Sequence, residues 1–111
     1  MSLNQEKYQV LANLLRQFHA DATNNQISAG QLRQHLDSLQ QFFGQQIAPL
    51  VEVDAREQSY RTEISKQLRL LEIDIMFFQG ARQQSTTQAR LQTIGDRLQT
   101  LIQYCEAILQ P

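Results

Sequence analysis

The residues best able to bind a metal or catalyse a reaction are two histidines and a single cysteine. His19 and His35 fall in different helical stretches, and neither follows a Glu by three positions, the spacing that metal-binding helical bundles use. Cys105 falls on the apolar side of the last helical stretch, where a thiol behaves as a small hydrophobic group with a raised pKa. We therefore expect no catalytic residue, no metal and no cofactor, so that the protein is not an enzyme.

Two neighbouring carboxylates, Glu72 and Asp74, invite an acid–base interpretation. At i and i+2 of a helix they project about 160° apart and cannot share a proton. Asp74 could pair with an arginine of a neighbouring helix. Lys66 and Arg69 have the helical spacing to bond Glu63 and Glu72. Such pairs are ordinary features of a solvated helix.

A strip of Arg90, Arg97 and Tyr104 at heptad spacing could contact nucleic acid. Asp96 and Glu106 lie close to it, and the 10 basic and 11 acidic residues of the chain nearly cancel to a net charge of -1. The strip therefore fits a solvated flank or the polar edge of a protein interface better than a nucleic-acid site.

Four stretches with helical period must position these residues. Ser2 with Gln5 and Ser28 with Gln31 have capping-box spacing and predict two helix starts, separated by a break at Asn24-Asn25. The apolar stripes are Tyr8, Leu11, Leu15, Phe18 and Ala22, widened by Val10 and Leu14, and then Leu32, Leu36, Leu39, Phe43 and Ile47.

Pro49 has no N–H to donate and disfavours helix at the residue before it, so the second helix should end or kink there. Asp54 with Glu57 offers a new helix start. A turn over residues 48–54 and one long helix kinked at Pro49 both remain open.

Ser85 with Gln88 predicts the start of the last helix, which should run to Pro111. Its apolar stripe is Leu91, Ile94, Leu98, Leu101, Cys105 and Ile108. Gly95 inside this helix costs stability and indicates the close approach of a neighbour. Short joins force antiparallel neighbours, so we expect an all-α fold, an antiparallel up-down-up-down four-helix bundle, as a single domain over residues 1–111.

The sequence also indicates the cellular compartment and whether the chain spans a membrane. A single cysteine allows no intrachain disulfide and favours a reducing environment. The first ten residues have no basic-then-apolar pattern of a secretion signal, and the longest apolar run is too short for a membrane span. We expect a cytoplasmic protein without a membrane span.

The third helical stretch, residues 60–82, carries more apolar surface than one bundle needs. Its core stripe is Ile64, Leu68, Leu71, Ile75 and Phe78. Leu70, Ile73 and Phe77 recur on nearly the opposite side, with Lys66 and Arg69 beside them. Exposed, these five residues would form an interaction face. Burial of the face under an amino-terminal segment with Leu3, Val10 and Leu14 remains the alternative.

Residues 60–83, YRTEISKQLRLLEIDIMFFQGARQ, and residues 96–105, DRLQTLIQYC, resemble the cyanobacterial heterocyst frequency control protein PatD family. The resemblance implies a small non-enzymatic regulator that tunes heterocyst differentiation frequency and binds the cell-division protein FtsZ. It transfers no catalytic residue.

The leading hypothesis is therefore a regulatory protein that acts through protein–protein interaction. Its face would dock FtsZ, another protein or a second copy in a homodimer, and we expect no nucleic-acid partner. A ligand- or metal-binding helical bundle, including an enzyme, is the alternative.

Overall fold

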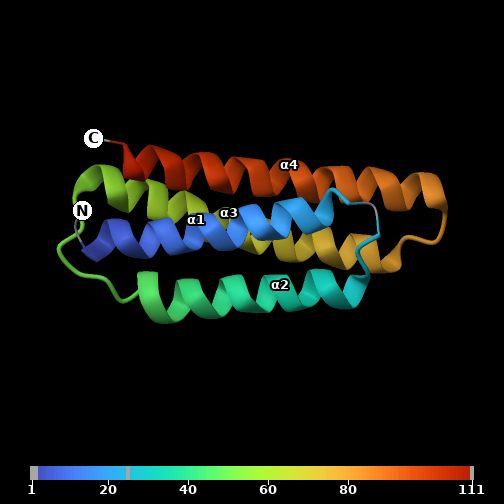
Figure 1. Cartoon of the computed structure of the whole chain (residues 1–111), viewed down its shortest axis with the longest axis horizontal. Coiled ribbons are helices and arrows are strands. Elements are labelled where there is room, and N and C mark those ends of the chain that lie inside the picture. Colours follow the sequence, from blue (N-terminus) through green and yellow to red (C-terminus); the bar gives the residue numbers. More distant parts are fainter. Residues whose placement is uncertain (1–2, 25, 111) are drawn as a thin grey trace.

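The protein is an antiparallel four-helix bundle (Figure 1). The computed structural model describes residues 3–24 and 26–110, with the side chain of Leu3 left out, and within these ranges it contains no strand. The predicted Ser2 cap, Asn25 and Pro111 lie outside them. The elements are α1 (Leu3–Ala22), α2 (Ala29–Phe42), the π-helical turn η1 (Phe43–Ile47), α3 (Ala55–Gly80) and α4 (Gln84–Leu109). The predicted all-α, up-down-up-down architecture is confirmed.

The helices pack in chain order around a common core. α4 has the most extensive contacts, with α1 and α3, whereas α2 contacts α1 and α3 less extensively. α1 and α3 occupy opposite corners of the bundle, as do α2 and α4. The two ends of the described chain, and the connection between η1 and α3, lie at the same end of the bundle (Figure 1). The result is a rod of 47 × 21 × 19 Å.

The core is formed by one apolar side of every helix. Its members are Tyr8, Leu11, Ala12, Leu15, Phe18, Ala22, Leu32, Leu36, Leu39, Ile47, Ile64, Leu68, Leu71, Ile75, Ile94, Leu98, Leu101, Ile102, Cys105 and Ile108. Most of the predicted stripe residues are among them. Val10 is an exception, because it turns away from the core and is 45% exposed.

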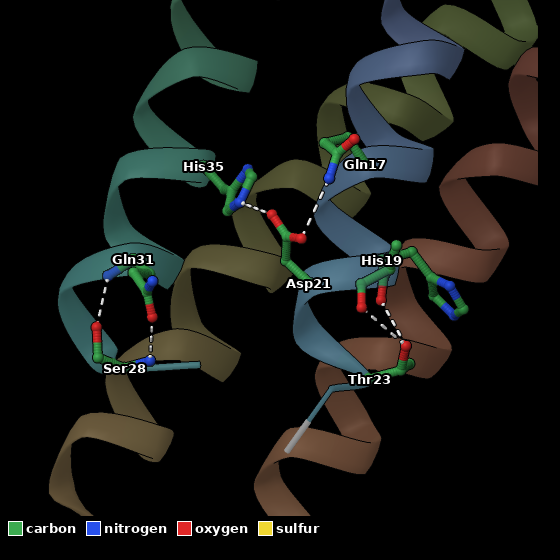
Figure 2. A network of polar contacts seen from close by, with 8 residues as sticks. Gln17, His19, Asp21, Thr23, Ser28, Gln31 and His35 are labelled. Carbon is green, nitrogen blue, oxygen red and sulfur yellow. Dashed lines mark hydrogen bonds and ion pairs between the residues drawn. The ribbon is translucent and has the colours of Figure 1, made fainter. Parts of the chain in front are cut away.

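Two of the predicted helix starts are confirmed by their capping hydrogen bonds. The N–H of Gln31 donates to Ser28 Oγ at 3.1 Å, and the N–H of Ser28 donates to Gln31 Oε1 at 2.8 Å, as Figure 2 shows. At α3 the N–H of Glu57 donates to Asp54 Oδ1 at 2.7 Å. The reciprocal pair at α2 and the single hydrogen bond at α3 satisfy backbone donors that would otherwise lack partners.

The predicted Ser85 cap is wrong. α4 begins at Gln84, and the residue at its N-cap position is Gln83, whose side chain makes no capping hydrogen bond. The backbone of Gln83 is extended, with φ -91° and ψ 143°, so the change to helical conformation comes before Ser85. Ser85 therefore lies inside the first turn.

The chain between the second and third helices is a true connection, not a kink. The N–H of Ala48 donates to the carbonyl of Phe43 at 2.8 Å, a five-residue span that closes η1. Helix does not resume until Ala55, and Glu52 adopts a positive φ of 61°. Because Pro49 cannot donate a hydrogen bond to the preceding turn, the helix ends here.

Arg61 holds this connection against α3. Its Nη1 donates to the carbonyl oxygens of Ile47 and Leu50, each at 3.1 Å. One guanidinium thereby binds two carbonyls of the connection, of which that of Ile47 also accepts from the N–H of Leu50 at 3.0 Å.

The close approach expected at Gly95 is not present. Gly95 is buried, but a Cβ added there would meet only Thr23 Cγ2, at 3.9 Å, an ordinary van der Waals distance. The space would accept a methyl group.

Candidate interaction groove

The two histidines are separated by the fold. His35 Nε2 lies 2.8 Å from Asp21 Oδ2, and its ring stacks on Phe18 with 4.6 Å between ring centroids. Gln17 Nε2 donates to the other Asp21 oxygen at 3.1 Å. Figure 2 shows the His19 side chain pointing away from this cluster. His35 thus joins α2 to α1, and the two imidazoles do not share a site.

The single cysteine is part of the core. Cys105 is fully buried, and burial raises the pKa of its thiol from about 9.0 to about 12. Throughout the described ranges, no group of three His, Cys, Asp or Glu side chains is placed to hold a metal ion. The helices found there also lack any span that is both long and apolar enough to cross a membrane.

Asp74 pairs with an arginine of the neighbouring helix, as predicted. Arg97 Nε donates to Asp74 Oδ2 at 2.9 Å, and Arg97 Nη1 donates to Gln67 Oε1 at 2.9 Å. Asp74 is buried, so this cluster ties α3 to α4 within a largely apolar seam.

The rest of the Arg90–Arg97–Tyr104 strip lies along the same seam. The Tyr104 ring lies 5.8 Å from the ring of Tyr60, and the Arg90 guanidinium lies 4.8 Å from the centre of the Phe77 ring. Each of the three residues therefore contacts α3. The strip joins two helices of the bundle.

The pairing of Glu72 with Lys66 or Arg69 is wrong. Glu72 faces α2, where its Oε2 lies 3.7 Å from Arg33 Nη1 and accepts a hydrogen bond from Gln40 Nε2 at 3.4 Å. Lys66 and Arg69 point to a different side of α3 and take part in none of the ion pairs formed by the described residues.

The side of α3 that faces neither α2 nor α4 is exposed and apolar. Ile73 is 45% exposed and Phe77 is 53% exposed, and Met76 beside them is 56% exposed. Leu70 is half-buried. Since α1 lies at the opposite corner of the bundle and Val10 is itself exposed, the alternative of burial under the amino-terminal segment is wrong.

This face forms one wall of an open groove with a volume of about 600 Å³. The second wall comes from Phe43 and Ala48, which are five residues apart and are joined by the backbone hydrogen bond that closes η1. The α3 wall consists of Gln58, Arg61, Thr62, Ser65, Lys66, Arg69, Leu70 and Ile73. The groove thus brings together Lys66, Arg69, Leu70 and Ile73, and Phe77 lies one turn beyond it.

Sequence reasoning missed the second wall and part of the first. Phe43 was assigned to the core stripe, but it is only half-buried. Met76 falls on the exposed side of α3 at i+3 from Ile73, so the helical period alone could have found it, whereas Arg61 is half-buried and turns towards the connection. Nothing local in the sequence indicates that Ala48 lies across from α3.

The groove is positively charged. Its lining contains Arg61, Lys66 and Arg69 and no Asp or Glu. Arg61 is engaged with the backbone carbonyls of the connection, which leaves the charges of Lys66 and Arg69 without an ion-pair partner in the described structure. In a chain of net charge -1 this is a local concentration of positive charge beside apolar side chains.

Comparison with known proteins identifies one family. The family described as the CRR41 C-terminal domain matches residues 7–106, which include all four helices for most of their length. No curated protein and no solved structure matches the chain.

Proposed function

The chain belongs to the CRR41 C-terminal domain family, and we propose that it acts as a non-enzymatic docking domain that binds another protein through the groove face of α3. The observation that carries this proposal is the exposure of Ile73, Met76 and Phe77 on one helix side, next to Lys66 and Arg69. An apolar patch rimmed by charge is typical of a protein-binding surface.

The identity of the partner comes from the PatD resemblance. On that basis the partner is FtsZ, and docking tunes the frequency of heterocyst differentiation in the cytoplasm of a cyanobacterium. This part of the proposal rests on residues 60–83 and 96–105. A homodimer through the same face is the competing occupant.

The test is light scattering of the pure protein with and without FtsZ. Ile73→Glu and Phe77→Glu place a charge on the docking face and should abolish any increase in mass. Val10→Glu is the matched control, since Val10 and Ile73 are both 45% exposed but lie on opposite corners of the bundle. Circular dichroism should show the same helicity in all variants.

The outcomes separate the candidates. A mass increase with FtsZ that only the α3 variants lose supports the full proposal. If the protein alone is a dimer and the same variants make it monomeric, the occupant of the face is a second copy of this chain and not FtsZ. Binding that survives Ile73→Glu and Phe77→Glu, or that Val10→Glu abolishes, places docking elsewhere and overturns the proposal.

A further inference from the structure

On the basis of the docking function proposed above, we infer that the groove binds an amphipathic helix whose apolar side is flanked by acidic residues. The apolar side would pack on Leu70, Ile73 and Phe43, and the acidic residues would face Lys66 and Arg69. This assigns a chemical class to the partner segment independently of the partner's name.

The positive charge of the groove favours a bound segment of negative charge. A lining with three cations and no acid would repel a basic segment and would leave Lys66 and Arg69 unpaired beneath a neutral one. Arg90, stacked on Phe77, adds a further positive charge at the other end of the face. Acidic residues at both edges of the bound segment would therefore find partners.

The dimensions favour an elongated occupant. From Gln58 to Phe77 the face extends for about 28 Å along α3 at the helical rise per residue. The apolar residues Leu70, Ile73 and Phe77 follow i, i+3, i+7 spacing on α3, so they form a continuous apolar strip along much of this length. A small molecule would occupy only a fraction of this length.

The backbone favours a helix over an extended peptide. An extended peptide gains affinity by adding a strand to a sheet edge, and the described chain has no strand. The N–H and C=O groups of the α3 interior are already bonded within the helix. Recognition here must come from side chains, which a helix presents on one side.

The shape favours a protein segment over a membrane surface. A helix that lies on a lipid surface presents its apolar side without an opposing wall. In this protein Phe43 and Ala48 stand across the groove from α3, so the surface is concave. A rod-shaped segment fits a concave surface better than a planar one does.

The experiment is a selection from peptides displayed on phage, using the intact protein as bait. Each peptide is about 15 residues long, with apolar residues fixed at i, i+3 and i+7 and all other positions random, so that either charge can be enriched. Enriched phage are then tested for binding to the Ile73→Glu variant and, as the matched control, to Val10→Glu.

We expect enrichment of Asp and Glu at the random positions, and binding that Ile73→Glu loses and Val10→Glu keeps. The enriched peptide should then lose about tenfold or more in affinity for the Lys66→Glu, Arg69→Glu double variant, measured by fluorescence anisotropy at low salt. Both substituted side chains are exposed, so the fold should survive, which circular dichroism checks.

The two proposals fail in different ways. Enriched peptides without an acidic excess that still require Ile73 would overturn the acidic-helix inference and leave the docking function standing. Peptides that bind Ile73→Glu equally well, or no enrichment at all, would overturn the acidic-helix inference, whereas the docking function fails only if light scattering shows binding that survives Ile73→Glu and Phe77→Glu. Displacement of the peptide by phosphatidylserine vesicles, with vesicle binding lost in Ile73→Glu, would replace the helix by a lipid surface.

Discussion

Two polar groups lie at full burial inside the bundle, the Tyr8 hydroxyl and the Cys105 thiol. No described atom lies within 3.5 Å of the Tyr8 hydroxyl in hydrogen-bonding geometry, and the Glu57 carboxylate acts on it from a longer distance. Burial raises its pKa well above the ordinary value, and the nearby charge of Glu57 raises it further. Both groups are therefore kept neutral by the core, and each has a measurable consequence.

Tyr8→Phe should stabilise the protein. The substitution keeps the ring in the core and removes a hydroxyl that is desolvated without compensation, a loss worth about 1 kcal/mol or more. Urea unfolding followed by circular dichroism measures the gain. Tyr60→Phe, at a half-buried position, is the control and should change stability by less than about 0.5 kcal/mol. A loss of stability in Tyr8→Phe would mean that the hydroxyl has a partner.

Cys105 should make the fold sensitive to alkali. The unfolded thiol ionises near its ordinary pKa of 9.0, whereas the folded thiol, with its pKa raised to about 12, stays protonated. The stability conferred by the thiol is thus fully present below about pH 9 and is lost as the pH rises towards the folded pKa.

The measurement compares urea unfolding of the natural chain with that of Cys105→Ala. The stability advantage of the natural chain should shrink by about 2 to 3 kcal/mol between about pH 8 and pH 11, because the unfolded thiol ionises over this range and the folded thiol does not. Ionisable groups common to both chains cancel in the comparison. An advantage that stays constant over this range would show that the Cys105 thiol ionises equally in both states.

At the scale of the helices, the features that the sequence predicted well are local ones. Ser28 and Asp54 cap their helices because each needs only the backbone three residues ahead. Ser85 has the same spacing but lies inside α4, since the extended backbone of Gln83 moves the start earlier. A capping pattern states which residues can cap, and the preceding connection decides which one does.

Gly95→Ala should stabilise α4. Alanine is favoured over glycine by about 1 kcal/mol in a helix interior, and the added Cβ would meet Thr23 Cγ2 at 3.9 Å. Thermal unfolding measures the shift. The control is Gly80→Ala at the end of α3, where nothing lies within 4 Å and the helix has little left to gain. If Gly95→Ala is instead destabilised, a neighbour does approach Gly95 closely, as expected from the sequence.

The candidate groove was predictable only in part, for a geometric reason. Lys66, Arg69, Leu70 and Ile73 share one side of a single helix, so their period in the sequence reveals them. Phe43 and Ala48 come from the other side of a connection whose path depends on Glu52 and on the two hydrogen bonds of Arg61. Pairings between distant segments follow from the fold and not from any local pattern.

At the scale of the whole molecule, charge is distributed unevenly. The chain carries a net charge of -1, and yet all the charged residues that line the groove are cations. Among the described residues four acids form ion pairs: Asp74 with Arg97, Glu72 with Arg33, Glu106 with Arg16 and Asp21 with His35. One side of α3 therefore concentrates positive charge, and its Lys66 and Arg69 take part in none of these ion pairs.

The placement of both chain ends at one end of the rod makes the order of the helices interchangeable (Figure 1). A circular permutant that joins the ends through a Gly/Ser linker and opens at residues 81–83 should fold with unchanged helicity, because every helix keeps its neighbours. Opening at residues 48–54 instead would free the carbonyls that Arg61 binds and should give a lower melting temperature. Equal melting temperatures of the two permutants would show that the two hydrogen bonds of Arg61 do not stabilise the fold.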